Sequence, residues 1–180
     1  MSFPKDAGKH LSKSDAMSLL SVADDCLRTS SPKDFAEILH QLSPVFPFEF
    51  ANTCLVILHD DLSVEKLVQQ VPYNFPVAWS KLYRAKNLAS IDPIARLLFR
   101  HRGPIFWSDI RLECQDSDSR RFYKLAADHS LHDGFSFGVR YPGSNRASLF
   151  TISGRRLMAP GPRERQMAAY VMPHLHAALG

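Results

Sequence analysis

Four side chains between residues 79 and 107 provide the groups needed to hold a small polar molecule in an apolar site. Trp79 and Tyr83 lie four residues apart, which places both on one face of a helix. Asp92 follows nine residues after Tyr83, and Trp107 lies fifteen residues beyond Asp92. An indole N–H only donates hydrogen bonds, whereas an ionised carboxylate only accepts them. Beside aromatic rings, these groups suit the burial of a neutral molecule with a few carbonyl and amide groups.

Each of these residues also has a simpler structural interpretation. Aromatic residues at helical spacing usually face the interior, so Trp79 and Tyr83 taken alone indicate core packing. Asp92 before Pro93 is typical of a helix N-cap followed by proline at the first helical position. Trp107 taken alone would also be ordinary packing. The functional interpretation therefore depends on all four residues occurring together at this spacing.

The sequence contains none of the common motifs of nucleotide-binding or catalytic sites. It has no GxxxxGK[ST] loop, no GxGxxG, no HExxH and no GxSxG. His59, Asp60 and Asp61 lie at the end of a predicted strand and could form part of a metal site, but acidic residues are common where a strand leads into a turn, which favours a solvated turn. His174 and His176 are two residues apart and so lie on different sides of a helix. We therefore predict that the chain is not an enzyme and that it needs no metal or cofactor.

Length and composition favour a single soluble domain. The chain has 180 residues, of which 45% are hydrophobic and 11% aromatic, which is enough for a sizeable core. The net charge of +4 would suit an anionic partner, but the basic residues are scattered, which argues against direct DNA binding by this chain. No apolar run is long enough to span a membrane, and no secretory signal is present. Cys26, Cys54 and Cys114 lie far apart and indicate reduced thiols, so we expect a cytoplasmic protein.

Hydrophobic periodicity and turn residues predict an α+β fold with a central antiparallel sheet and helices on both faces. Residues 1–15 are expected to be a flexible segment, and residues 16–180 to form one domain. Strands do not alternate regularly with long helices, which disfavours a doubly wound parallel sheet. Pro173 is expected to kink or shorten the final helix. Helices are expected over 14–28, 32–43, 75–88, 94–102, 120–131 and from 162 onward, and strands over 48–59, 64–71, 135–141 and 147–153.

The pattern W-x3-Y-x8-DP-x13-W, followed by a helix that ends near Gly134, closely resembles the autoinducer-binding domain of LuxR-type quorum-sensing regulators. The similarity covers roughly residues 16–176, and its most specific part is 75–134. The resemblance implies an α–β–α sandwich that buries an N-acyl-homoserine lactone between its sheet and one helical layer.

The resemblance also implies roles for individual residues. In that family, the tryptophan that matches Trp79 donates its indole N–H to the lactone carbonyl. The aspartate that matches Asp92 accepts a hydrogen bond from the amide N–H of the ligand. The aromatic residues that match Tyr83 and Trp107 enclose the head group, and a strand hydroxyl, here Thr151 by spacing, often reaches an oxygen of the acyl chain.

The sequence departs from the family pattern at several points. The family usually has a tyrosine four residues before the tryptophan, and its hydroxyl binds the amide-side carbonyl. Phe75 occupies this position and has no hydroxyl, so Tyr73, two residues earlier, is considered as a substitute. A frequent glycine before Gly134 is Ser130 here. The chain also ends at Gly180 without the helix-turn-helix DNA-binding domain of LuxR-type regulators.

The leading hypothesis is therefore the sensor domain of a LuxR-type transcriptional regulator. It would bind an N-acyl-homoserine lactone or a related small signal, form a homodimer, and reach DNA only through a helix-turn-helix domain absent from this chain. The alternative is a stand-alone interaction protein that heterodimerises with a full-length homologue and inhibits it. An enzyme that acts on the lactone is third, because it would need a nucleophile or metal set that the sequence does not contain.

Overall fold

The computed structural model describes residues 8–45, 47–155 and 160–180, and a five-stranded antiparallel sheet stands at its centre. The strands follow the order β2-β1-β5-β4-β3 across the sheet. Their bounds are β1 (Phe50–Leu58), β2 (Val64–Tyr73), β3 (Ile105–Phe106), β4 (Gly134–Arg140) and β5 (Arg146–Ser153). β2 and β3 are the two edges of this sheet.

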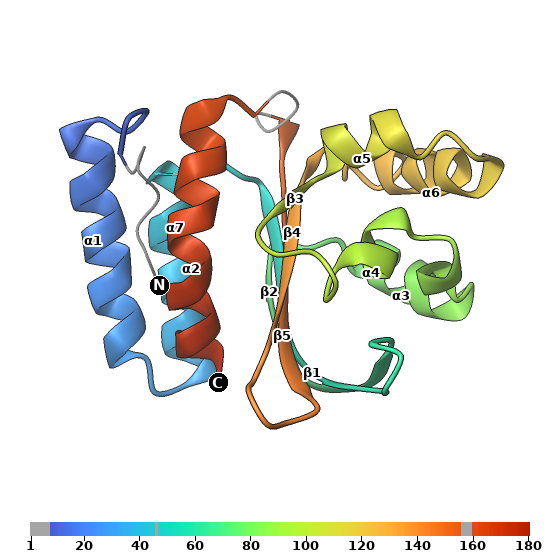
Figure 1. Cartoon of the computed structure of the whole chain (residues 1–180), viewed down its shortest axis with the longest axis horizontal. Coiled ribbons are helices and arrows are strands. Elements are labelled where there is room, and N and C mark those ends of the chain that lie inside the picture. The colour runs from blue at the N-terminus through green and yellow to red at the C-terminus, as the bar shows by residue number, and fades with distance from the viewer. Residues whose placement is uncertain (1–7, 46, 156–159) are drawn as a thin grey trace.

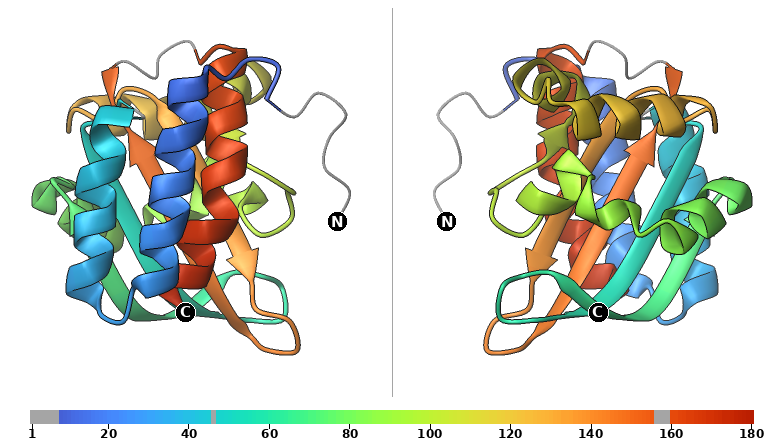
Figure 2. Two further views of the ribbon diagram at one scale, coloured as in Figure 1. Left: turned by 90° about the vertical axis from the view of Figure 1, so that its left-hand side faces the viewer. Right: turned by 90° about the vertical axis from the view of Figure 1, so that its right-hand side faces the viewer.

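Helices cover both faces of the sheet, as Figure 1 and the two rotated views in Figure 2 show. One face carries α1 (Lys13–Arg28), α2 (Pro32–Val45) and α7 (Pro162–Leu179). The other face carries α3 (Val77–Ala85), the short 3-10 helix η1 (Leu88–Ser90), α4 (Pro93–Leu97), α5 (Trp107–Glu113) and α6 (Ser117–Ala127). The predicted α–β–α sandwich around an antiparallel sheet is confirmed.

The two faces of the sheet are packed differently. Beneath α1, α2 and α7 lies a dense core in which Phe137 and Phe150 stack with ring centroids 4.4 Å apart. Both rings are fully buried, as are Phe35 and Leu175 from the helices above them. The opposite face carries a separate cluster built around Trp79 and supported by shorter helices. Rigid packing on the first face therefore supports the strands that form the floor of the second.

Several element bounds differ from those expected. α4 ends at Leu97 and not at residue 102, and α6 spans 117–127, earlier than the expected 120–131. β3 and α5 were not predicted, because two residues are too few for a periodic signal and α5 has only seven. Pro173 lies inside α7 and does not shorten it, since the buried Leu175 and Leu179 beyond it hold the last turns against the core.

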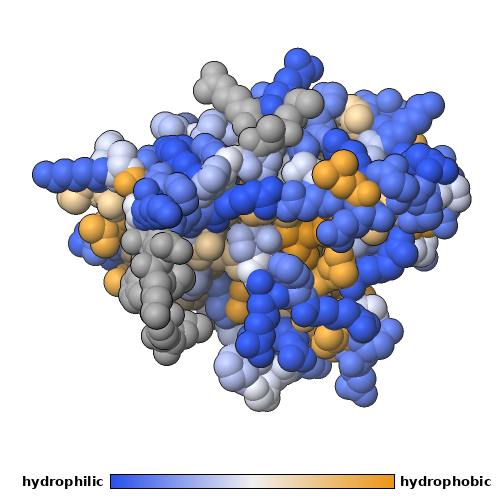
Figure 3. Space-filling model, turned by 45° about the horizontal axis from the view of Figure 1, so that its top comes forward, coloured by the Kyte–Doolittle hydropathy of each residue, from blue (hydrophilic) through white to orange (hydrophobic). Residues whose placement is uncertain are grey.

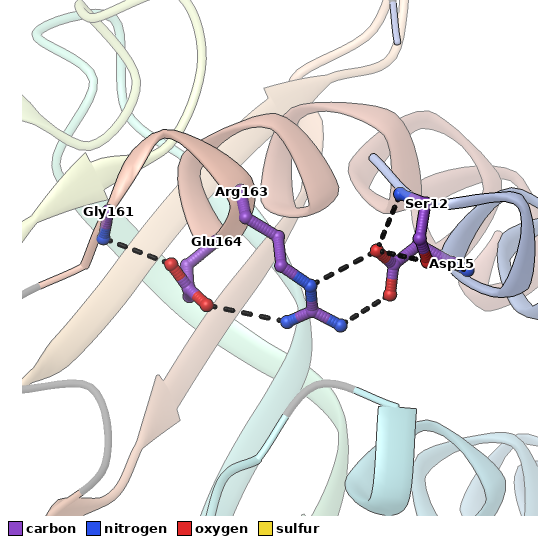
Figure 4. Close-up of polar contacts among 5 residues, drawn as sticks. All are labelled: Ser12, Asp15, Gly161, Arg163 and Glu164. Atoms are coloured by element: carbon purple, nitrogen blue, oxygen red, sulfur yellow. Dashed lines mark hydrogen bonds and ion pairs between the residues drawn. The ribbon is translucent and has the colours of Figure 1, made fainter. Parts of the chain in front are cut away.

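The N-terminal segment is ordered earlier than expected. Residues 1–7 lie outside the described residues, but α1 begins at Lys13, with Ser12 as its N-cap. Asp15 is 8% exposed, and its carboxylate accepts hydrogen bonds from the backbone N–H and hydroxyl of Ser12, both at 2.9 Å. It also forms an ion pair with Arg163 at the start of α7, in which Arg163 Nε donates at 3.1 Å (Figure 4). These contacts join the first and last helices.

Replacing Asp15 with asparagine is expected to lower the free energy of unfolding by about 1–3 kcal/mol, because hydrogen bonds between charged groups are lost at a buried position. The Arg163 guanidinium holds the pKa of Asp15 well below its ordinary value of 3.8. The stabilisation should therefore be complete above about pH 4 and decrease as the pH falls through the lowered pKa of the folded state. Urea denaturation at pH 7 measures the loss.

The matched control is Asp24→Asn, which removes the exposed ion pair between Asp24 and Arg28 on the same helix. Exposed pairs of this kind contribute about 0–1 kcal/mol, so the control should unfold nearly as the unmodified protein does. Equal stability of the two variants would contradict a structural role for Asp15.

Candidate ligand-binding cavity

A cavity of about 910 Å³ lies between the sheet and the helical layer formed by α3 to α6. Its floor consists of side chains from β1, β2, β4 and β5, and its walls come from the helices and from the turn after β1. Small-molecule sites typically measure roughly 300–1,000 Å³ and are mostly apolar, with a few well-placed polar groups. This cavity is therefore large enough for a ligand with a long apolar tail.

Six of the seven predicted binding residues line this cavity: Phe75, Trp79, Tyr83, Asp92, Trp107 and Thr151. The seventh, Tyr73, lies on the other side of the sheet. Its ring packs against Phe48 at 5.5 Å and His40 at 6.3 Å, beside the core under α2. Successive side chains of a strand point to opposite faces, and Tyr73 shares the face of Val71. The expectation that Tyr73 replaces the hydroxyl missing at Phe75 is therefore wrong for this fold.

Trp79 provides a hydrogen-bond donor on the helical wall of the cavity. Its indole ring is buried by edge-on contacts with Tyr83 and Phe122, each at 5.7 Å, and lies 5.6 Å from the ring of His129. Within the ranges that the structure describes, no hydrogen bond from the indole N–H to the protein is found. The ring is thus fixed by packing while its N–H stays free to donate to a bound molecule.

Asp92 provides the acceptor, and two elements hold its carboxylate in place. Oδ1 caps α4 by accepting from the backbone N–H groups of Ile94 at 2.8 Å and Ala95 at 3.2 Å, and Pro93 begins the helix. Oδ2 accepts from the hydroxyl of Tyr83 at 2.9 Å. Because each carboxylate oxygen has two lone pairs, the carboxylate keeps capacity for one more donor. The N-cap interpretation and the binding interpretation of Asp92 are therefore compatible.

Burial changes the acid–base behaviour of Asp92. The side chain is 8% exposed, and desolvation of its charged form raises the pKa of Asp92 from 3.8 to about 6. The hydrogen bonds from Tyr83, Ala95 and Ile94 and the positive charge of Arg96 act in the opposite direction. Burial also raises the pKa of the Tyr83 hydroxyl well above 10, so this hydroxyl remains a donor. At neutral pH the site therefore presents a buried carboxylate.

Trp107 and Thr151 belong to a chain of hydrogen bonds that the sequence analysis did not foresee. Trp107 Nε1 donates to the hydroxyl of Ser136 at 3.1 Å, and Ser136 Oγ lies 3.3 Å from Thr151 Oγ1. Ser136 on β4 pairs directly with Thr151 on β5, so both side chains point to the cavity. The indole N–H of Trp107 is thus already used within the protein, unlike that of Trp79.

Most of the other residues that line the cavity could not be recognised from the sequence. Strand alternation alone leaves two choices for which face of β1 or β5 borders a cavity, and only the packing of helices on both faces decides between them. The residues missed include Asn52, Cys54, Val56, Gln70, Phe122, Ser136 and Leu149. Alternation from Thr151, which was predicted, would have identified Leu149 on the same strand.

Ser130 illustrates the meaning of one departure from the family pattern. It follows α6 with a φ of 67°, in the left-handed region that glycine adopts most easily. A serine there accepts some backbone strain at the turn that returns the chain to β4. The serine at this position therefore affects the turn between α6 and β4 and not the binding site, since Ser130 does not line the cavity.

Two other kinds of site can be checked directly against the described residues. Within 8–45, 47–155 and 160–180, no group of three metal-ligating side chains is found, and no helix is long and apolar enough to cross a bilayer. Figure 3 shows a largely hydrophilic face, on which apolar side chains gather to the right of the centre and, in a smaller group, at the left edge.

Comparison with known proteins identifies one family. The autoinducer binding domain family matches residues 31–179. The transcriptional activator protein ExpR of Dickeya dadantii is 30% identical over 84 residues, which cover 46% of this chain and 34% of ExpR. The chain thus matches about a third of the length of that relative.

Solved structures show the same fold at low sequence identity. Escherichia coli SdiA superposes with a TM-score of 0.64 at 18% identity, covering 92% of this chain and 66% of SdiA. CepR2 of Burkholderia cenocepacia, described as an N-acylhomoserine lactone dependent LuxR family transcription factor, superposes with a TM-score of 0.60 at 20% identity, covering 91% of this chain and 99% of CepR2. SdiA has also been solved in complex with octanoyl-rac-glycerol.

Proposed function

Since this chain belongs to the autoinducer binding domain family of LuxR-type regulators, we propose that its cavity binds an N-acyl-homoserine lactone and that it is the sensor domain of a transcriptional regulator. The relatives are named as transcriptional activators, which agrees with the prediction that the chain is not an enzyme. In this proposal the protein forms a homodimer and contacts DNA through a helix-turn-helix domain outside these 180 residues.

The observation that carries the proposal is a free indole donor and a buried carboxylate on the wall of one apolar cavity. Trp79 would donate to the lactone carbonyl, and Asp92 would accept from the amide N–H of the ligand. The rings of Tyr83 and Trp107 would enclose the head group between them. A ligand carbonyl or N–H that left water without gaining a hydrogen bond to the protein would cost about 1–3 kcal/mol of binding free energy. Trp79 and Asp92 would avoid this cost, so together they would favour a ligand with this head group.

The apolar part of the cavity would supply most of the affinity. Burial of an acyl tail contributes about 0.8 kcal/mol per CH₂ before the cost of ordering the chain is subtracted. A ligand that binds only the folded protein raises its stability by mass action. Signal binding would thereby increase the amount of folded, active regulator.

Calorimetric titration with lactones of four to twelve acyl carbons tests the proposal, and octanoyl-rac-glycerol serves as a comparison ligand. We expect at least one lactone to bind and to raise the melting temperature of the protein. Mass spectrometry of small molecules that co-purify from cells supplied with mixed lactones should recover the same compound. Binding of the glycerol ester without binding of any lactone would overturn the lactone assignment.

Phe75 allows a direct test of how the acyl carbonyl is bound. This ring lines the cavity, and Phe75→Tyr would add one donor with little change in volume. For a standard lactone we expect a gain of about 0.5–1.5 kcal/mol in binding free energy, the net contribution of one hydrogen bond. Calorimetric titration of both forms measures the change. A clear loss of affinity would mean that the ligand lies differently or carries no carbonyl at this point, because the buried hydroxyl would then lack a partner.

A further inference from the structure

A row of polar side chains crosses the floor of the cavity, one from each of four neighbouring strands. Ser136 on β4 pairs with Thr151 on β5, and Thr151 pairs with Asn52 on β1. Gln70 on β2 extends the row to the sheet edge, because its Nε2 donates to Asn52 Oδ1 at 2.7 Å. All four side chains line the cavity. The row thus connects the buried interior of the site with its open edge.

The two halves of this row have different surroundings. Ser136 accepts a hydrogen bond from Trp107, which belongs to the proposed head-group region, and is itself hydrogen-bonded to Thr151. Asn52 lies two strands from Ser136, which corresponds to roughly 10 Å at the usual strand spacing. The adjoining floor is apolar and includes Cys54, Leu149, Val56 and Leu67. The amide pair of Asn52 and Gln70 is therefore a polar group beside the region available to a tail.

The hydrogen bond from Gln70 determines what Asn52 offers to a ligand. It takes one of the two lone pairs of the Asn52 carbonyl oxygen and so fixes the orientation of the amide, which leaves the N–H groups of Asn52 as donors. The Asn52 amide acts on the thiol of Cys54 and lowers its pKa against the effect of burial, but sulfur is a weak acceptor. A ligand oxygen would be a better partner than this thiol. Asn52 thus presents a donor, held in orientation by Gln70, at the tail region of the cavity.

We propose that Asn52, oriented by Gln70, is a specificity-determining residue that donates a hydrogen bond to an oxygen on the acyl chain of the ligand. The inference rests on the proposed lactone function and adds the class of acyl chain: one with an oxo or hydroxyl substituent, preferred over an unsubstituted chain of equal length. An unsubstituted chain would cover the Asn52 N–H groups without replacing their water partners, which opposes binding.

Calorimetry with matched pairs of lactones, 3-oxo and unsubstituted at the same chain length, tests this inference. We expect the unmodified protein to bind the 3-oxo compound about three- to tenfold more tightly. Asn52→Leu should bring this ratio close to one, because leucine has a similar size and no donor. Gln70→Leu should lower the ratio less, since it frees the Asn52 amide to rotate. The control is Gln69→Leu, whose side chain lies on the opposite face of β2 and should leave the ratio unchanged.

A second variant keeps the test decisive if Asn52→Leu does not fold. Asn52→Asp replaces the donor with an acceptor, so it should disfavour the 3-oxo chain and retain a 3-hydroxy chain, which can donate. An unmodified protein that binds both members of a pair equally, or an Asn52→Leu protein that keeps the full ratio, overturns the inference and leaves the lactone function standing. If the unmodified protein binds no lactone at all, the proposed function and the inference both fail.

Discussion

Replacing Asp92 with asparagine is expected to weaken lactone binding by about 1.5–3 kcal/mol, which corresponds to roughly 10- to 150-fold in the dissociation constant. Asparagine keeps the shape of the side chain, and its oxygen can still cap α4 through the N–H groups of Ile94 and Ala95. Its NH₂ group would then face the ligand N–H, so one donor would oppose another, and the Tyr83 hydroxyl, which now donates to Asp92, would have to accept from this group instead. Calorimetric titration, with thermal shift as a check of folding, measures the effect.

The companion change at the donor is Trp79→Phe, which removes the indole N–H and should cost about 1–3 kcal/mol of binding free energy. The matched control is Asp116→Asn. Asp116 also caps a helix, accepting from the backbone N–H of Ser119 at 2.9 Å, but it does not line the cavity. Unchanged lactone affinity in both Asp92→Asn and Trp79→Phe would end the assignment of these residues to the head group.

Lactone affinity is also expected to fall about tenfold for each unit of pH below 6. The pKa of Asp92 in the unliganded fold is raised to about 6, and only the ionised form accepts the ligand N–H. Binding therefore requires loss of a proton below pH 6 and is independent of this group above about pH 7. The side chains that lower the pKa of Asp92 against its burial are Tyr83 from α3 and Arg96 from α4, and the charge of Asp92 in turn raises the pKa of Tyr123 on α6. Burial raises the pKa of both tyrosine hydroxyls above 10, so neither of them titrates in this range. Calorimetry between pH 5 and pH 7.5 measures the dependence.

The folding stability of the unliganded protein should show the opposite pH dependence, as far as Asp92 contributes to it. Because the folded pKa of Asp92 lies above its ordinary value of 3.8, the folded state binds more protons than the unfolded chain between about pH 4 and pH 6. The contribution of Asp92 to stability is therefore greatest below pH 4 and is lost as the pH rises through 6. Asp92→Asn should abolish both trends. Lactone affinity that stays constant from pH 7.5 to pH 5 would show that the carboxylate does not accept the ligand N–H.

Local chemistry in the sequence was sufficient to predict much of this protein. Asp92 before Pro93 specifies a helix start by its own hydrogen-bonding capacity, and the structure confirms that cap. Alternation in β4 and β5 and helical periodicity in α1 and α7 predicted these elements, because each signal depends on neighbours a few residues away. The joint spacing of Trp79, Tyr83, Asp92 and Trp107 identified the family, and these side chains do line one cavity.

Tertiary structure alone decided which face of each strand meets the cavity. Tyr73 and Phe75 are two residues apart, and no local signal indicated that β2 would end between them, with Tyr73 facing α2 and Phe75 the cavity. The chain from Trp107 through Ser136 to Thr151 and the pair of Asn52 and Gln70 depend on the register of strands far apart in sequence. Such pairings are selected by burial of both faces of the sheet at once. No single residue indicates which pairing forms, because the stabilising free energy comes from contacts between segments that are distant in the sequence.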